Sequence, residues 1–372
     1  MMEGVLEFMY WSSLGLVVYT YAMYPALIYT LSRLCRRDFR IGNELLSVTI
    51  VIAVRNEEQR VGRKLDSLLE LDYPADKINI VVVSDGSTDR TDAIVQGFDD
   101  RNIRLERIES GAGKASALNR GVSSAGGELV VFCDVRQHVD VGAVRALVAP
   151  FADPSIGAVS GELHTGSDRG PGIYWRYEKF IRIAESRFSS AVGATGHLYA
   201  IRRNLFRALP KYLLLDDVYT PMQIVLQGYR VLFEPAAKVF DEEASIKAEF
   251  LRKARTLAGN FQLLHQLPGV LNPGRNPIFV QFISHKVLRL VCPYAFIMLF
   301  ISNVWLLVSG SSAPVYGFSF SVQVFIYSLA VKGILGNGSG WQLTRIFHTF
   351  VVFNAAAIEG LRRYLRGDFR WH

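Results

Sequence analysis

The sequence predicts an α/β domain with a Rossmann-like, mixed and mostly parallel sheet, joined to α-helical transmembrane segments. Two observations lead to this fold class. Between residues 42 and 240, apolar runs typical of buried strands alternate with helical patterns. On both sides of this region, long stretches without charge have the length that crosses a bilayer.

Each apolar run in the middle of the chain is followed by a polar cluster. The runs span residues 47–54, 79–84 and 129–133, with helical patterns at 61–71, 92–98 and 115–122. Parallel strands end at the same edge of a sheet, and ligands bind in the crevice there. One polar cluster alone could be a turn that caps a helix. Three clusters at one edge predict a binding site.

The composition agrees with a membrane protein. Of 372 residues, 50% are hydrophobic and only 20% are charged, with a formal net charge of +7. The apolar content excludes a disordered chain, and three scattered cysteines give neither a disulfide framework nor a zinc site. A reducing compartment is compatible with them. The positive charge alone would suit nucleic acid, but the chain has no recognition motif, so we expect no nucleic-acid partner.

The first predicted span covers residues 8–32, which contain no charged residue. The alternative is a buried core helix. Four arginines follow at once, and no small-residue cleavage site does, so we interpret the segment as an anchor with the following domain in the cytoplasm. The arginines are Arg33, Arg36, Arg37 and Arg40.

Two further spans are expected within residues 290–331, separated by a turn at 309–314. A last apolar stretch, 346–358, is too short to span unaided and could lie in the interface. The basic cluster of Arg362, Arg363, Arg366 and Arg370 favours three crossings, and a fourth stays open. The expected division is an anchor (1–41), a cytoplasmic domain (42–240), amphipathic interfacial helices (241–288) and C-terminal membrane helices (289–372).

Four motifs in the middle region, taken in order, resemble those of the family 2 glycosyltransferases with a GT-A fold. The motifs are Val-Arg-Asn-Glu-Glu at 54–58, Ser-Asp-Gly-Ser-Thr-Asp at 84–89, Gly-Lys-Ala-Ser-Ala-Leu-Asn at 113–119 and Phe-Cys-Asp at 132–134. The resemblance covers roughly residues 47–255. Membrane members of that family include hyaluronan, chitin, cellulose and poly-N-acetylglucosamine synthases.

The resemblance implies a nucleotide-sugar donor, in particular a uridine diphosphate sugar. Asp85 would hold the nucleoside, and Lys114 would contact the nucleotide or diphosphate, although a solvated loop lysine is the alternative. The full donor-binding set that the resemblance implies is Asn56, Glu57, Asp85, Lys114, Asp134, Arg252 and Arg255.

Asp134 would begin the metal-binding Asp-x-Asp motif of the family and ligate Mg²⁺ or Mn²⁺. The sequence departs from that motif at Arg136, where the family has a second acid. A guanidinium cannot ligate a metal, but it can neutralise a phosphate. Asp134 could hold the ion with fewer protein ligands, Asp140 or water could substitute, or metal dependence could be weaker.

Asp217 matches the position of the family's catalytic base, which takes the proton of the acceptor hydroxyl during inversion. The alternative for Asp216 and Asp217 is an acidic pair at a helix N-terminus. On the acceptor side, the resemblance places the glycine-rich stretch of Gly193, Thr195 and Gly196. We interpret His197 beside it as structural.

Arg252 and Arg255, three residues apart, resemble the family's (Gln/Arg)-x-x-Arg-Trp motif, in which the second arginine would pair with the departing diphosphate. The alternative is a basic amphipathic helix on anionic lipid, and both can hold. Thr256 replaces the tryptophan of the motif, which puts processive polymerisation in question. Aromatic residues that could replace it are Trp175, Tyr177 and Phe180.

The expected function is therefore an inverting membrane glycosyltransferase, a hexosyl- or N-acetylhexosaminyltransferase, at the cytoplasmic face of a bacterial-type inner membrane. The acceptor would be a hydroxyl of a growing polysaccharide or of a lipid-linked glycan. A single-addition glycolipid enzyme and a non-catalytic membrane scaffold are the alternatives. A homo-oligomer or a membrane partner would supply further helices for a processive enzyme.

Overall fold

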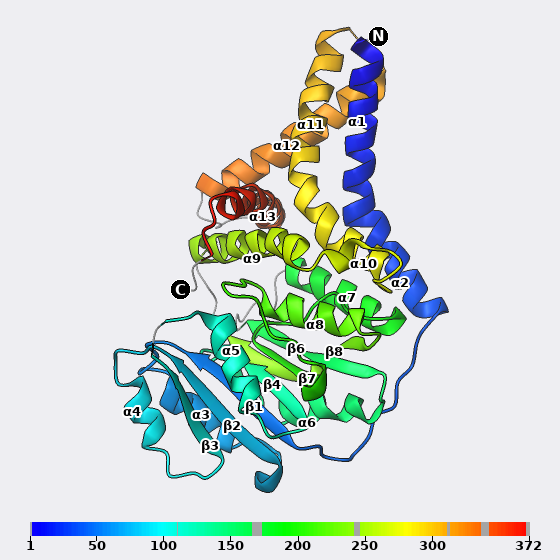
Figure 1. Ribbon diagram of the computed structural model, residues 1–372. Coiled ribbons are helices and arrows are strands. Elements are labelled where there is room, and N and C mark those ends of the chain that lie inside the picture. The colour runs from blue at the N-terminus through cyan, green and yellow to red at the C-terminus, as the bar shows by residue number, and fades with distance from the viewer. Residues whose placement is uncertain are drawn as a thin grey trace.

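The structure, a computed structural model, describes residues 2–109, 111–165, 173–241, 246–310, 313–335 and 342–369. Arg370 of the predicted basic cluster, and Ser311 and Ser312 of the predicted turn, lie outside the described residues. Figure 1 shows two parts: a sheet with helices on its faces and, above it, a group of long helices. These parts correspond to the α/β region and the membrane segments expected from the sequence.

The described residues form one eight-stranded sheet in the order β3-β2-β1-β4-β7-β6-β8-β5. Neighbours from β3 to β4 are parallel, as are β6 and β8, whereas β7 is antiparallel to β4 and β6, and β5 to β8. The sheet is thus mixed and mostly parallel, as predicted. Its strands are β1 (Val48–Val54), β2 (Ile78–Asp85), β3 (Ile103–Ile108), β4 (Leu129–Cys133), β5 (His138–Val139), β6 (Ile156–Thr165), β7 (Leu198–Arg202) and β8 (Arg230–Asp241).

The first half of the sheet follows directly from its sequence. The three expected apolar runs form β1, β2 and β4, which are almost wholly buried because helices cover both faces. The chain moves outward from β1 to β3 and then returns to place β4 on the other side of β1. This reversal creates a topological switch point between β1 and β4, where a ligand crevice is expected.

Two hydrophobic cores lie on opposite faces of this sheet. One is made with α3 (Val61–Leu69), α4 (Thr91–Gln96) and α6 (Ala143–Val148). The other is made with α5 (Lys114–Ser123) and α8 (Asp216–Leu226), and it also includes residues of α9 (Ile246–Gln266) and α10 (Phe279–Phe282). The second core therefore joins the sheet to the membrane part of the chain.

Within the described residues, three helical segments are long and apolar enough to cross a membrane: Glu3–Leu34, Phe279–Val308 and Pro314–Leu335. They comprise α1 (Met2–Val18) with α2 (Tyr24–Leu34), α10 with α11 (Leu288–Val308), and α12 (Pro314–Leu335). One π-helical turn joins α1 to α2 (Tyr19–Met23) and another joins α10 to α11 (Ile283–Val287). Figure 1 shows α1 and α11 rising side by side from the sheet domain, and these two helices pack closely.

The doubtful fourth segment forms α13 (Gln342–Leu365), which packs along α9 above the sheet domain (Figure 1). Gly360 makes this close approach feasible, because a Cβ atom there would lie 2.9 Å from the Ala258 backbone nitrogen and 3.0 Å from the Ala254 carbonyl oxygen. α7 (Ile173–Phe188) similarly packs against α2. A fourth crossing of the membrane by α13 stays an open prediction from the sequence.

Candidate active site

The polar clusters predicted at the sheet edge are brought together by the loops that follow β1 and β2. Asn56 adopts a left-handed backbone conformation with φ 54°, which asparagine tolerates better than most residues. Its side-chain oxygen accepts a hydrogen bond of 2.8 Å from the Thr88 amide. The Glu57 amide in turn donates to the Thr91 hydroxyl (2.8 Å). The two predicted motifs thus shape one wall of the crevice.

Asp85 ends β2 and is fully buried. Its two carboxylate oxygens accept hydrogen bonds from the amides of Ala112 (2.7 Å) and Gly113 (2.8 Å). Gly113 has φ 88°, a conformation that favours glycine, and α5 begins at the next residue. Asp85 therefore positions the loop that presents Lys114, and its direct contact with a nucleoside stays a prediction.

Lys114 is the central cation of the crevice. Its Nζ lies 3.1 Å from Asp134 Oδ1 and 3.2 Å from Asp216 Oδ1. Burial opposes its charge, but the carboxylates of Asp134, Asp216 and Asp217 raise its pKa above the ordinary value. Lys114 is consequently cationic at neutral pH, and it is not the solvated loop lysine of the alternative interpretation.

Asp134 follows β4 at the switch point and also faces His197. His197 Nδ1 lies 3.1 Å from Asp134 Oδ2, so this histidine belongs to the site, although the sequence gave only weak grounds for it. Burial opposes ionisation of Asp134, but Lys114 and His197 hold its pKa well below the usual range. A permanently ionised carboxylate beside an imidazole is a donor pair that a divalent cation accepts.

Arg136, the departure from the family motif, does not contact Asp134. Its guanidinium hydrogen-bonds the Asp241 carboxylate, which also accepts a bond of 3.0 Å from Gln137 Nε2. Asp140 accepts a hydrogen bond of 3.1 Å from the Gly142 amide just before α6. Among the described residues, no group of three histidine, cysteine, aspartate or glutamate side chains converges as a metal site.

Asp217 lies in the first turn of α8, beside the acidic partner Asp216. Its half-buried carboxylate has no hydrogen bond or ion pair with any described residue. Burial, together with the charge of Asp216, raises the pKa of Asp217 from 3.8 to about 6, against the opposing effects of Lys114, Lys286 and His197. A free carboxylate with a pKa near neutrality suits a general base.

The predicted acceptor-side stretch packs directly against Asp217. Gly193 has φ 93°, and a Cβ atom on Gly196 would lie 2.8 Å from Asp217 Oδ2, so glycine is what allows the loop to approach the carboxylate. The amide of Thr195 donates to Ser160 Oγ (2.8 Å), and its hydroxyl accepts a hydrogen bond of 2.9 Å from Arg182 Nη1. The loop therefore joins Asp217 to a cation of α7.

α9 holds the segment that leads into α8. Gln262 accepts a hydrogen bond from the Leu214 amide (2.9 Å) and donates one to the Tyr212 carbonyl (3.0 Å). Arg252 on the same helix lies 3.7 Å from Glu249, and its carbonyl accepts a bond of 3.0 Å from the Thr256 hydroxyl. Arg255 is half-buried and makes no ion pair with a described residue. Contact of these two arginines with the diphosphate stays a prediction.

The fold is an α/β domain with acidic and basic side chains gathered at its switch point, where domains of this kind bind nucleotides. Residues 49–209 match the family model described as Glycosyl transferase family 2. The predicted family resemblance and the predicted glycosyltransferase class are thereby confirmed over these residues.

Curated relatives share this part of the chain. A probable glycosyltransferase YdaM of Bacillus subtilis is 26% identical over 245 residues, which are 58% of this chain and 56% of that protein. A poly-beta-1,6-N-acetyl-D-glucosamine synthase of Staphylococcus aureus is 25% identical over 52% of this chain and 50% of its own length. A beta-monoglucosyldiacylglycerol synthase of Synechocystis is 34% identical over 30% of this chain and 24% of its own length. The chain thus spans about half the length, or less, of these relatives.

A solved structure extends the likeness over the candidate membrane spans. A mannosyltransferase of Pyrobaculum calidifontis, in complex with GDP-Man and Mn²⁺, has a TM-score of 0.73 and 22% identity, covering 98% of this chain and 99% of that one. The likeness confirms the GT-A fold together with the arrangement of its flanking helices.

Proposed function

We propose that the protein is an inverting glycosyltransferase that moves one sugar from a nucleotide sugar to a hydroxyl group of a membrane-held acceptor. The observation that carries the proposal is Asp217, an unpaired carboxylate with a pKa of about 6 at the junction of the donor crevice and the acceptor loop. Such a group can take the hydroxyl proton while the oxygen attacks the anomeric carbon on the side opposite the leaving diphosphate.

The donor would lie along the sheet edge. The β1 and β2 loops, with Asn56 and Glu57, would enclose the nucleoside, and Lys114 would meet the diphosphate. Lys114 already bridges two carboxylates, so it can neutralise charge on the leaving group without moving far. The uridine diphosphate sugars expected from the sequence are the first donors to test.

Asp134 would supply an oxygen ligand to Mg²⁺ or Mn²⁺, with diphosphate oxygens and water as the others, and His197 would orient that carboxylate. Such an ion, when bound, neutralises the diphosphate as the glycosidic bond breaks. The same-fold mannosyltransferase of Pyrobaculum calidifontis contains Mn²⁺. Because Arg136 is engaged with Asp241 and no second acid follows Asp134, the ion would depend on the donor for much of its coordination.

Single addition to a lipid-linked glycan is the form of the reaction that we favour over processive synthesis. The tryptophan expected near the acceptor in polymerising relatives is replaced by Thr256, whose hydroxyl is bonded within its own helix. Three candidate spans also supply few helices to line a path for a polymer. The catalytic domain would face the cytoplasm at an inner membrane, next to the basic segment at residues 33–40.

The test is transfer from a panel of radiolabelled nucleotide sugars by the full chain in membranes and in detergent, with and without chelator. We expect label in a product that is one sugar longer than the acceptor. A product whose length grows with time would instead establish processive synthesis. Asp217→Asn should lower the rate of transfer about 100-fold or more but keep donor binding, whereas the exposed Asp66→Asn on α3 is the matched control. Full activity of Asp217→Asn would overturn the proposal.

A further inference from the structure

Behind the acceptor loop, where the catalytic domain meets the membrane helices, lies a cluster of cations that the donor chemistry does not use. Arg182 comes from α7, Lys253 from α9, Lys286 from the π-helical turn before α11, and Arg289 from α11. The charges of Arg182, Arg289, Glu178 and Asp217 all act on Lys286, so these groups share one environment. Their side chains are half-buried, in a part of the protein where charge is costly.

Carboxylates neutralise only part of this cluster. Arg289 pairs with Glu178, and His285 lies between Glu178 (3.2 Å) and Glu185 (2.8 Å). Glu185 also accepts a hydrogen bond of 2.5 Å from Tyr24. Both carboxylates are therefore already engaged by other partners. Glu178 also acts on Lys253 and Lys286 electrostatically, as Glu249 does on Lys253, but no carboxylate forms an ion pair with either lysine among the described residues.

Three cations have no carboxylate within ion-pair distance among the described residues. Arg182 has only the Thr195 hydroxyl at 2.9 Å. Lys253 has the Tyr174 hydroxyl at 2.9 Å and the ring of Phe353 at 4.8 Å. Lys286 makes no hydrogen bond or ion pair with the described part of the chain. Partly buried positive charges without a carboxylate at ion-pair distance are expected to recruit an anion.

The position of these cations indicates which substrate would bring that anion. Arg182 is bonded to the acceptor loop, and Lys286 is close enough to Asp217 to lower its pKa. In an inverting displacement, the acceptor and the leaving diphosphate lie on opposite sides of the anomeric carbon. Cations on the acceptor side of the base therefore meet the acceptor, whereas Lys114 meets the donor.

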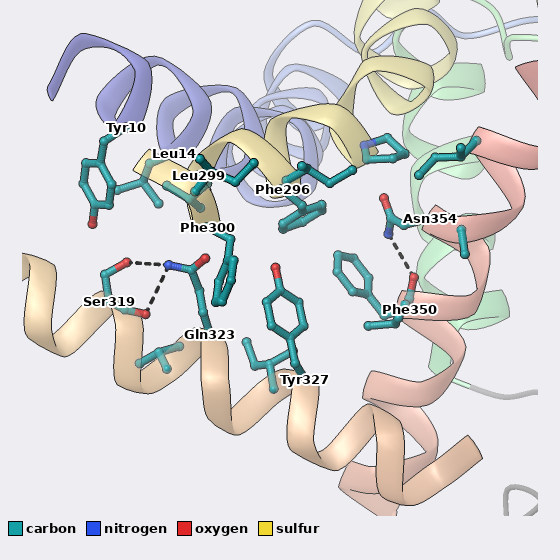
Figure 2. Close-up of a pocket in the computed structure, with 18 of the residues that line it drawn as sticks. Tyr10, Leu14, Phe296, Leu299, Phe300, Ser319, Gln323, Tyr327, Phe350 and Asn354 are labelled. Carbon is teal, nitrogen blue, oxygen red and sulfur yellow. Dashed lines mark hydrogen bonds between the residues drawn. The ribbon is translucent and has the colours of Figure 1, made fainter. Parts of the chain in front are cut away.

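An apolar cavity of about 770 Å³ lies between α1, α11, α12 and α13. Figure 2 shows it lined by rings such as Phe296, Phe300, Tyr327 and Phe350, with Gln323 and Asn354 bonded within their own helices. This volume lies within the range of about 300–1,000 Å³ that is usual for ligand sites.

Two helices, α11 and α13, carry residues of both the cavity lining and the surroundings of the cations. Pro293 lines the cavity one turn after Arg289 on α11, and Asn354 lines it next to Phe353, the ring beside Lys253. A molecule with an anionic head and an apolar chain could therefore place its head among the cations and its chain in the cavity. Most lining residues are apolar, and only the Tyr10 hydroxyl and Gln323 Oε1 are buried without a hydrogen-bond partner among the described lining residues, so the cavity suits a hydrocarbon chain.

Building on the proposed function, we propose that Arg182 and Lys286 bind the phosphate group of a lipid-linked acceptor whose hydrocarbon chain lies in the cavity between α1, α11, α12 and α13. Lys253 and Arg289 add positive potential behind this phosphate site. The sugar hydroxyl of the acceptor is then held beside Asp217 by an anchor in the membrane. The acceptor is thereby assigned to the anionic lipids, in contrast to a neutral diacylglycerol glycolipid.

The first test asks whether the labelled product is anionic. Membranes that contain the full chain are supplied with the radiolabelled donor that gives transfer, and the lipid product is passed over an anion-exchange resin. We expect the labelled lipid to be retained and then eluted by salt. A labelled lipid that passes through uncharged would overturn this inference and leave the proposed function standing, whereas no label in any product would count against the proposed function.

The second test measures binding to the full chain in phosphatidylcholine nanodiscs, with empty nanodiscs as blank. The probes are dodecyl phosphate, dodecanol and inorganic phosphate. We expect dodecyl phosphate to bind more tightly than either partial probe, and Lys286→Gln to weaken it about tenfold or more. Equal binding of inorganic phosphate would show that the cavity does not take the chain, and this would overturn the lipid assignment.

Matched variants separate the phosphate site from a structural role. Lys286→Arg should restore binding, and Lys332→Gln on the exposed side of α12 should leave it unchanged. Nucleotide affinity is measured on each variant. Lys286→Gln that weakens nucleotide binding and spares dodecyl phosphate would assign the cation to the donor, which contradicts the inference.

Discussion

Replacing Asp217 by asparagine should lower the rate of catalysis and raise the stability of the protein. The variant keeps the shape of the side chain but removes the proton acceptor. We expect kcat to fall by about 10²- to 10⁴-fold, the usual contribution of a general base, with little change in nucleotide affinity. In the wild-type protein, kcat should rise with pH up to about 6, where Asp217 becomes ionised, and this limb should be absent from the residual activity of the variant.

The same substitution should make the protein more stable at neutral pH. Burial and Asp216 raise the pKa of Asp217 from 3.8 to about 6, which corresponds to about 3 kcal/mol against the ionised form in the folded state. The folded-state pKa lies above the unfolded value, so this cost is absent below about pH 4, grows between about pH 4 and 6, and is constant above that.

Thermal unfolding of both proteins between pH 4 and 8 measures this difference. The melting temperature of Asp217→Asn should match that of the wild-type protein at the acid end and exceed it by several degrees above pH 6. Asp66→Asn should show no such divergence, because this side chain is exposed. Equal melting temperatures across the range, together with retained transfer activity, would refute the assignment of Asp217 as a general base whose pKa is raised by its surroundings.

Three further outcomes follow from the site and its supports. Lys114→Ala leaves two carboxylates without their shared cation, so we expect a loss of about 3 kcal/mol in unfolding free energy and weaker binding of nucleoside diphosphate in a titration. Gly196→Ala places a methyl group 2.8 Å from Asp217 Oδ2, so kcat should fall at least about tenfold at unchanged nucleotide affinity, measured by transfer assays and binding. Gly360→Ala forces α13 away from the α9 backbone, at a cost of about 1–3 kcal/mol that a lower melting temperature would show, whereas alanine at the exposed Gly4 should have no effect.

The first half of the fold could be predicted because its strands are continuous apolar runs. β1, β2 and β4 contain almost only buried side chains, and their ends carry the motifs. The strands β6 and β8 could not be found in this way. β8 alternates between buried and exposed positions over its second half, and its pairing with β6 is interrupted by register shifts. Such strands are specified by their neighbours more than by their own pattern.

Asp134 and Asp217 could be predicted as candidate site residues because each is an acid at the expected place in the order of the motifs. His197 and Lys286 could be placed only by the fold, because His197 bonds Asp134, 63 residues away in sequence, and Lys286 acts electrostatically on Asp217, 69 residues away. A signal for Lys286 does exist in the sequence. Lys286 and Arg289 stand near the start of an otherwise apolar helical segment, where charges are expensive to bury and often mark function. For Asp85, the resemblance suggested a ligand contact, and the structure adds a supporting role for the loop before α5.

The contact between α9 and α13 has a consequence for how the enzyme is made. Gln262 of α9 holds the segment before Asp217, and α13 covers α9 at Gly360, nearly one hundred residues further along the chain. A nascent chain that has emerged only as far as α9 carries every group of the crevice, but the helix that fixes the base has nothing above it. Under the proposed function, transfer would therefore require α13 to have docked on α9, so that full activity would appear only once this late helix is in place.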